Sequence, residues 1–209
     1  MLTIQRNESA DSLRQGLEIL YKSSNVQTFR RGSAIPLSLN HISIVRQGVV
    51  HLGTLYPNGE ESMIGIACTG MPFGLSLTQV DPYYATALSD VTIVSLKTTD
   101  VQESEALSQL VMQYCTDRLR QVEALLATAG YRRVEDRLRQ FLLLLAQEVG
   151  QPTALGTRMN VRLTHQVLAN ATGTTRVTIT RLLGQLRKEG WLQIDRNHHI
   201  VICDQRLAA

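Results

Sequence analysis

The chain has 209 residues, 44% of them hydrophobic and only 5% aromatic, which is enough for two small domains with aliphatic cores. It contains no run of eighteen apolar residues, and its N-terminus lacks the form of a signal peptide, so we expect a soluble cytoplasmic protein without membrane contacts. The net charge is only +3, yet residues 156–209 carry eight Lys and Arg against three Asp and Glu, a balance that suits phosphate binding.

The cysteines and histidines show no metal-binding pattern. Cys68, Cys115 and Cys203 lie far apart and include no Cys-x-x-Cys spacing, so neither a zinc site nor an iron–sulfur cluster is indicated. The five histidines also lack a spacing that would place two ligands on one element. Each cysteine is therefore expected to be a small apolar residue of a core.

Residues 26–96 are predicted to be rich in β-strand. Short runs of β-branched and aromatic residues alternate with turn signals such as Tyr56-Pro57-Asn58-Gly59. Many short strands at close spacing are typical of a small barrel or jelly roll, so residues 1–99 are expected to form one β-barrel domain. A short helix is expected at about residues 9–23, before its strands. The strands are expected at residues 42–45, 49–55, 63–67, 83–87 and 91–96.

Residues 100–129 are predicted to form one long helix. Its main apolar row steps by three or four residues, and a helix of roughly 28 residues would extend about 42 Å, which is more than a small barrel could bury. This favours pairing with a second copy, so residues 100–130 are assigned to a dimerisation helix and hinge. The alternative is an amphipathic helix packed within its own chain. The row consists of Leu107, Val111, Tyr114, Arg118, Val122, Leu125 and Ala129.

Residues 131–209 are predicted to form a separate C-terminal domain. A helix at residues 134–149 follows a hinge at residues 130–133, and residues 150–157, with Pro152 and Gly156, are expected to form a loop. Near the C-terminus, two strands flank a turn, which is typical of a winged helix. These strands are expected at residues 191–194 and 199–202.

Residues 163–191 carry a helix-turn-helix pattern. A first amphipathic segment is followed by Gly173, where a tight turn needs a positive φ. Thr174 or Thr175 can cap a second helix, and arginines near the start of such a helix can bind guanine in the major groove. An ordinary pair of surface helices is the alternative. The apolar stripe of the second helix is Ile179, Leu182, Leu183 and Leu186, and the candidate base contacts opposite it are Arg176, Val177, Thr180 and Arg181.

This order of elements resembles the CRP/FNR superfamily of bacterial transcription regulators over nearly the whole chain. The similarity rests on residues 174–184, on Arg137-Leu138 and on Phe73-Gly74, and the recognition helix is most similar to that of cyanobacterial nitrogen regulators. The resemblance implies an α+β fold with a jelly-roll β-barrel of the cyclic-nucleotide-binding type, a dimerisation helix and a winged helix-turn-helix. It also implies a homodimer that binds double-stranded DNA and RNA polymerase.

The resemblance assigns roles within the helix-turn-helix. Arg176 and Arg181 would read bases, and Val177, which stands where much of the family has a glutamate, would contact a thymine methyl group. The implied target is a palindrome of GTA and TAC half-sites. Phosphate contacts, which fix the register without reading the sequence, are implied for Thr164, His165, Gln166, Thr175 and Thr178.

Members of this family bind a small effector between the barrel and the long helix. The positions near Asp81-Pro82 carry no arginine to neutralise a cyclic phosphate, which argues against cyclic AMP. Similarity to the nitrogen regulators makes 2-oxoglutarate the candidate effector, although one expected barrel arginine is missing. One alternative is an Arg118–Glu123 ion pair, within one helix or between two, that sets the dimer register without a ligand. Another is an effector-independent paralogue that responds to another metabolic signal. The implied effector-binding residues are Phe73, Gly74, Leu75, Ser76, Arg118 and Glu123.

An enzyme and a barrel scaffold without DNA binding are the rival interpretations. A metal-dependent barrel enzyme needs a His-x-His cluster, whereas His41 and His51 are isolated, and no serine lies in a Gly-x-Ser-x-Gly context. Arg176 and Arg181 on one exposed helix face argue against a scaffold. The sequence therefore predicts a regulator and not an enzyme.

Overall fold

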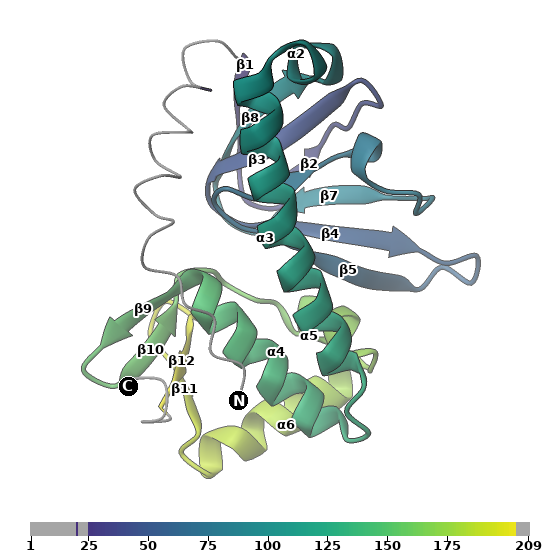
Figure 1. Ribbon diagram of the computed structural model, residues 1–209. Coiled ribbons are helices and arrows are strands. Elements are labelled where there is room, and N and C mark those ends of the chain that lie inside the picture. The colour runs from purple at the N-terminus through teal and green to yellow at the C-terminus, as the bar shows by residue number, and fades with distance from the viewer. Residues whose placement is uncertain (1–19, 21–24, 204–209) are drawn as a thin grey trace.

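Two four-stranded antiparallel sheets pack as a jelly-roll sandwich in the N-terminal part of the computed structural model, which describes residue 20 and residues 25–203 (Figure 1). The sheet orders are β1-β8-β3-β6 and β2-β7-β4-β5, so the expected jelly-roll fold is confirmed. The strands are β1 (Asn25–Phe29), β2 (Ala34–Ile35), β3 (His41–Gln47), β4 (Val50–Leu55), β5 (Glu61–Ala67), β6 (Pro72–Phe73), β7 (Tyr84–Ala87) and β8 (Val91–Lys97), with the 3-10 helix η1 (Leu75–Leu77) after β6.

The sequence located five of these strands and missed β1, β2 and β6. The strands β2 and β6 have only two residues each, which is too short for a periodic pattern to show. The strand β1 pairs with β8 in an antiparallel register, Val26 opposite Val94, through backbone bonds that its sequence did not indicate. The helix expected at residues 9–23 lies, apart from Leu20, outside the described residues and stays a prediction.

The sheet that contains β3 and β8 is covered on both faces. Its inner face contributes Val45 and Ile93 to the core of the sandwich. Its outer face contributes Ile44 and Val94, which pack with Tyr114 of the long helix in a second apolar cluster. These strands therefore have consecutive buried residues instead of strict alternation, and the outer cluster fixes the long helix to the sandwich.

The long helix expected at residues 100–129 is in fact two helices. They are α2 (Thr98–Glu103) and α3 (Glu105–Ala129), and Ser104 between them has extended dihedral angles, φ −115° and ψ 112°. The Ser104 hydroxyl accepts a hydrogen bond from the Leu107 backbone N–H at 3.4 Å, so this serine caps α3. The apolar periodicity continues across the break, which is why the sequence did not reveal it.

The apolar row that the sequence assigned to dimerisation packs mostly on its own chain. Val111 and Tyr114 are buried against the sandwich, and Arg118 contacts β5. A different row of α3 stays exposed: Met112 is 69% exposed, Leu119 57% and Leu126 73%. The first half of the predicted row is therefore not available for pairing, because the sequence could not show which of two apolar rows the sandwich covers.

The C-terminal domain begins with α4 (Val134–Val149), as predicted. Residues 150–157, expected as a loop, instead form most of a hairpin of β9 (Gly150–Thr153) and β10 (Gly156–Met159). Pro152 is tolerated there because β9 is an edge strand, where a proline removes no hydrogen bond of the sheet interior. This hairpin joins β11 (Leu192–Ile194) and β12 (Ile200–Ile202) in a sheet of order β11-β12-β10-β9. Among the helices that the structure describes, none is long and apolar enough to span a membrane.

Candidate nucleic-acid interface and effector site

Two capped helices and a glycine turn form the helix-turn-helix. The first helix, α5 (His165–Thr172), is capped by Thr164, whose hydroxyl accepts from the Val167 N–H at 3.1 Å. Gly173 follows with φ 60°, the left-handed conformation that ends many helices. The second helix, α6 (Arg176–Lys188), is capped by Thr175, whose hydroxyl accepts from the Thr178 N–H at 3.2 Å. The predicted turn and one of the two predicted caps are confirmed.

The apolar stripe of α6 anchors this helix in the domain. Its members pack against Leu138 and Leu168 of α4 and α5 in the core, and burial of each side chain of this kind contributes about 1.5–3 kcal/mol. The opposite face is free for a partner, and Val177 is 78% exposed. The four buried residues are those predicted from the sequence: Ile179, Leu182, Leu183 and Leu186.

The four candidate base-contacting side chains share the exposed face of α6. Arg176 and Arg181 are exposed beside Val177, so their guanidinium groups can reach a groove. Thr180 differs from them, because its hydroxyl already has partners within the protein. It donates to the Arg176 carbonyl at 2.9 Å and lies 2.8 Å from Nδ1 of His165. The methyl group of Thr180 is therefore the part left for DNA.

The candidate phosphate-contacting residues also hold the motif together. Thr164 and Thr175 use their hydroxyls as helix caps, and the Thr178 hydroxyl lies 3.0 Å from that of Thr175. Gln166 donates to Asn170 at 2.7 Å. His165 is half-buried at the start of α5, and its Nδ1 lies 2.8 Å from the Thr180 hydroxyl. The structure thus places all five on or beside the N-terminal ends of α5 and α6.

Arg137 fixes the hinge to the helix-turn-helix. Its guanidinium donates to the carbonyls of Tyr131 at 2.9 Å, Arg132 at 3.3 Å and Thr172 at 2.9 Å. Since Thr172 ends α5, these bonds hold the hinge backbone next to the turn that precedes α6. Sequence reasoning used Arg137 only as part of a motif and missed this role, because its carbonyl partners lie up to 35 residues away.

A second cluster that the sequence missed organises the wing. Arg158 donates to Asp195 at 2.7 Å, and its guanidinium lies 2.8 Å from Nδ1 of His199. Asp195 also accepts from the backbone N–H groups of Asn197 and His199, both at 2.8 Å. Its bond to Arg158 is the main reason that the pKa of the Asp195 carboxyl lies well below its usual range. This cluster sets the shape of the turn between β11 and β12.

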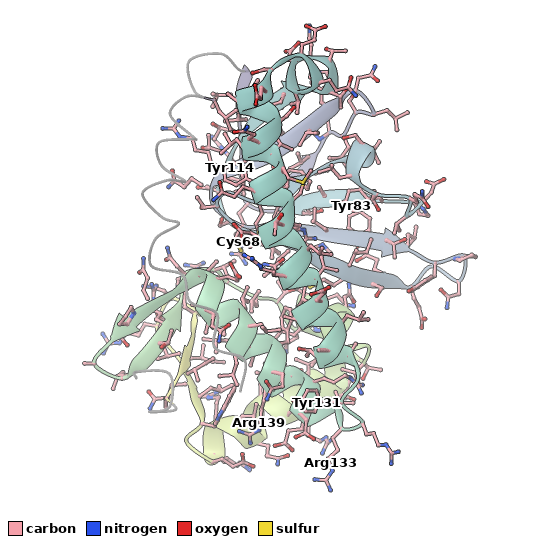
Figure 2. The ribbon with its side chains drawn as sticks, in the orientation of Figure 1. Cys68, Tyr83, Tyr114, Tyr131, Arg133 and Arg139 are labelled. Carbon is pink, nitrogen blue, oxygen red and sulfur yellow. The ribbon has the colours of Figure 1, made fainter. Side chains whose placement is uncertain are left out.

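A second site lies where α3 crosses β5. Arg118 donates to the Ile66 carbonyl at 2.8 Å and to Oε1 of Gln121, and both acceptors are neutral. A Cβ at Gly65 would lie 2.5 Å from Nη2 of Arg118, so the guanidinium occupies the space that a side chain at position 65 would take. Burial lowers the pKa of Arg118, and the neighbouring Tyr83, Cys68 and Glu148 raise it. Figure 2 shows Cys68 and Tyr83 on the two sides of α3 at this height.

The predicted effector residues are only partly brought together. The Gly74 backbone and Arg118 both act on the phenol of Tyr83, although burial is the larger effect and raises the pKa of that phenol. Phe73 is buried in the sandwich, Leu75 begins η1, and Ser76 donates to the His41 carbonyl at 3.1 Å. Tyr83 was not predicted for this site, because only the fold places it between the loop and α3.

Glu123 is not a partner of Arg118 in this chain. It is exposed, whereas the Arg118 guanidinium contacts Gln121 and β5. The alternative of an Arg118–Glu123 ion pair within one helix is therefore wrong. Five residues correspond to about 140° around a helix, so the two side chains leave α3 in different directions.

Comparisons with known proteins agree with this architecture. Residues 136–207 match the family of Crp-like helix-turn-helix domains. The global nitrogen regulator of Synechocystis sp. is 33% identical over 207 residues, covering 93% of this chain and 91% of that protein. The regulatory protein CysR of Synechococcus elongatus is 34% identical over 164 residues, covering 77% and 75%.

The fold matches a solved structure as well. A CRP-family transcriptional regulator from Thermus thermophilus superposes with a TM-score of 0.75 at 21% identity, covering 87% of this chain and 93% of that one. The capped recognition helix, its two exposed arginines and relatives that extend over most of the chain lead to one conclusion. The chain belongs to the CRP/FNR family and is a DNA-binding transcription regulator.

Proposed function

We propose that this regulator binds a palindromic DNA site as a homodimer, contacts RNA polymerase from that site, and is controlled by a small anion at Arg118. The observation that carries the proposal is the face of α6, where Arg176, Val177 and Arg181 are exposed beside one another at the end of a capped helix. Two such helices, related by a two-fold axis, fit a site of GTA and TAC half-sites one helical turn apart.

The exposed row of α3 supports the dimer. Its members recur at alternating steps of three and four residues, which is the heptad pattern of a parallel two-stranded coiled coil. Its three large side chains, Met112, Leu119 and Leu126, are exposed on the side of α3 away from the sandwich. Cys115 is half-buried and packs partly against the outer apolar cluster of the sandwich. A second copy is the occupant that fits, because each side chain then meets its own equivalent. The row is Met112, Cys115, Leu119, Val122, Leu126 and Ala129.

Native Cys115 makes this dimer testable. In a parallel pair on the exposed row, Cys115 lies opposite Cys115 of the partner subunit, whereas Cys68 is buried in the sandwich. Mild oxidation with copper phenanthroline should therefore give a covalent dimer in wild type and none in Cys115→Ser. A wild-type protein that stays monomeric by sedimentation, or one that cross-links equally well without Cys115, would contradict pairing on this row.

Arg118 supports control by an anion. It is the arginine that α3 places on β5, its hydrogen-bond partners are neutral, and burial already disfavours its charged form. A carboxylate that replaced these neutral partners would form stronger, charge-assisted bonds. The adjacent Gly74 backbone and the Tyr83 phenol offer further donors. We propose 2-oxoglutarate as the first effector to test. The alternative is that the regulator responds to a different metabolic anion.

Fluorescence anisotropy separates the two parts of the proposal. A labelled GTA-(eight bases)-TAC duplex and a scrambled duplex are titrated with and without 2-oxoglutarate, using wild type and Arg118→Gln. We expect wild type to prefer the palindrome, 2-oxoglutarate to strengthen that binding, and Arg118→Gln to lose the response. A preference that ignores the ligand would reject 2-oxoglutarate and keep the DNA site. Equal binding to both duplexes would reject the DNA site.

A further inference from the structure

We propose that Arg132 and Arg133, in the hinge between α3 and α4, form a second phosphate-binding surface that contacts the DNA backbone beside the bases read by α6. This inference rests on the proposed DNA binding, and it adds residues to which no role in binding has been given. It concerns residues that sit between the two domains and outside the helix-turn-helix motif itself.

The three carbonyl bonds of Arg137 place the hinge at this position. They join the backbone of Tyr131 and Arg132 to Thr172, and only Gly173, Thr174 and Thr175 separate Thr172 from the first residue of α6. The hinge is therefore continuous with the surface that presents Arg176. A duplex that meets the start of α6 has its backbone close to the hinge, because phosphates border the groove on both sides.

The two hinge arginines are available for such a contact. Arg132 and Arg133 are both exposed, and neither takes part in an ion pair with another residue of the described range 25–203. The nearest carboxylates along the chain are Glu135 and Asp136. Glu135 is already bonded to Arg139 at 2.9 Å, so its charge is largely compensated. Figure 2 shows Arg133 projecting from the lower edge of the molecule, away from Arg139.

Arg133 also occupies an unfavourable place for a structural residue. It is the N-cap of α4 and makes no side-chain cap, although Ser, Thr, Asp and Asn are the residues that satisfy the free N–H groups there. A cation at this end is further disfavoured by the helix dipole. Arg133 thus does not stabilise the start of α4, but its guanidinium can attract a phosphate, which is negative and accepts hydrogen bonds.

Four variants test this surface by duplex titration over a range of salt concentrations. They are Arg132→Gln, Arg133→Gln, the double variant, and Lys97→Gln as a matched loss of charge at the end of β8 in the sandwich. The double variant should lose affinity by the same factor, at least tenfold, for the palindrome and for a scrambled duplex. The slope of log affinity against log salt should flatten by about 0.9 for each phosphate that the protein no longer neutralises. Lys97→Gln should match wild type.

Arg133→Asp distinguishes a binding role from misfolding. The aspartate supplies the missing cap, so the melting temperature should rise while DNA affinity falls, and a damaged fold cannot produce both changes. The inference is overturned if the hinge variants match Lys97→Gln in affinity and salt slope, or if affinity is lost for the palindrome alone. If wild type binds no duplex, the proposed function itself fails. If wild type binds DNA and the hinge variants bind it with the same affinity and salt slope, this inference alone fails.

Discussion

The helix-turn-helix and the site around Arg118 are formed in different ways. The helix-turn-helix consists of residues close together in sequence: each of its two cap residues accepts a hydrogen bond from the residue three positions ahead, and its turn contains a single glycine. The Arg118 site joins α3 to a carbonyl 52 residues away, and adds a loop and a tyrosine from elsewhere in the sandwich. Local chemistry positions the first site, and the tertiary fold positions the second.

Disrupting the proposed dimer tests whether a single helix-turn-helix binds the palindrome, and we expect the largest loss of affinity from this change. Leu119→Asp places a carboxylate on the exposed row of both helices, where each buried leucine would contribute about 1.5–3 kcal/mol. Affinity for the palindrome should fall by roughly a hundredfold or more, because half of the contacts are lost. Sedimentation and anisotropy measure the two effects. Gln113→Asp, an exposed change off the row, is the control, and a dimeric Leu119→Asp protein would disprove the interface.

A methyl group added at Gly65, beside Arg118, and one added at Gly184, in α6, should change the stability of the protein in opposite directions. Gly65→Ala should displace the Arg118 guanidinium, because the new Cβ would lie 2.5 Å from Nη2. Loss of the hydrogen bond to the Ile66 carbonyl should destabilise the protein by about 1–3 kcal/mol and abolish the effector response. Gly184→Ala in α6 meets open space and should stabilise that helix by up to about 1 kcal/mol. Thermal unfolding gives both values. A stable, effector-responsive Gly65→Ala would show that Arg118 is not held as described.

Thr180 allows a finer test within the helix-turn-helix. Thr180→Val keeps methyl groups but loses the hydroxyl that joins His165 to the Arg176 carbonyl, which should cost about 1 kcal/mol on every duplex. Thr180→Ser keeps the hydroxyl and loses the methyl, so it should weaken only those sites at which a thymine methyl is read. Duplexes with deoxyuridine in place of thymine check the second effect. The reverse pattern would mean that the hydroxyl reads the base.

The wing gives the smallest expected effect and a dependence on pH. The lowered pKa of Asp195 means that its stabilising bonds are present above the ordinary carboxyl range and are lost as pH falls through the lowered pKa. The pKa of His199 is lowered too, mainly by burial, so acid also opposes the fold there by charging this ring. Asp195→Asn should therefore be less stable at neutral pH and lose less stability in acid. Chemical unfolding at pH 7 and pH 3 checks this difference, and parallel acid profiles would refute it.

The same contrast explains what the sequence could and could not predict. The stripe of α6, the Gly173 turn and the cap at Thr175 follow from local patterns, and the structure confirms them. The sequence assigned Val111 to the exposed row of α3 because Val111 and Leu119 are both apolar, and only the sandwich decides which of them is covered. The break at Ser104 went unnoticed for a related reason, since the periodicity runs across it.

The Arg118 site shows the limit most clearly. Arg118 was identified from the sequence, but its predicted partner Glu123 is exposed, and Gln121 and the Ile66 carbonyl hold it instead. Spacing along a helix does not report which strand the helix crosses. The sequence could not show that Gly65 and Tyr83 lie next to Arg118, because the fold brings β5 and the segment before β7 to α3 from distant parts of the chain.

The most direct test of the central claim is the affinity of wild type and Arg181→Ala for the GTA–TAC palindrome and for a scrambled duplex of equal length. An arginine that reads a base should contribute about 1–3 kcal/mol, a factor of roughly 5 to 150, to the palindrome alone. We expect Arg181→Ala to lose that factor on the palindrome and to bind the scrambled duplex like wild type. An equal loss on both duplexes would show that Arg181 contacts only phosphate and would contradict the assignment of α6 as the sequence reader.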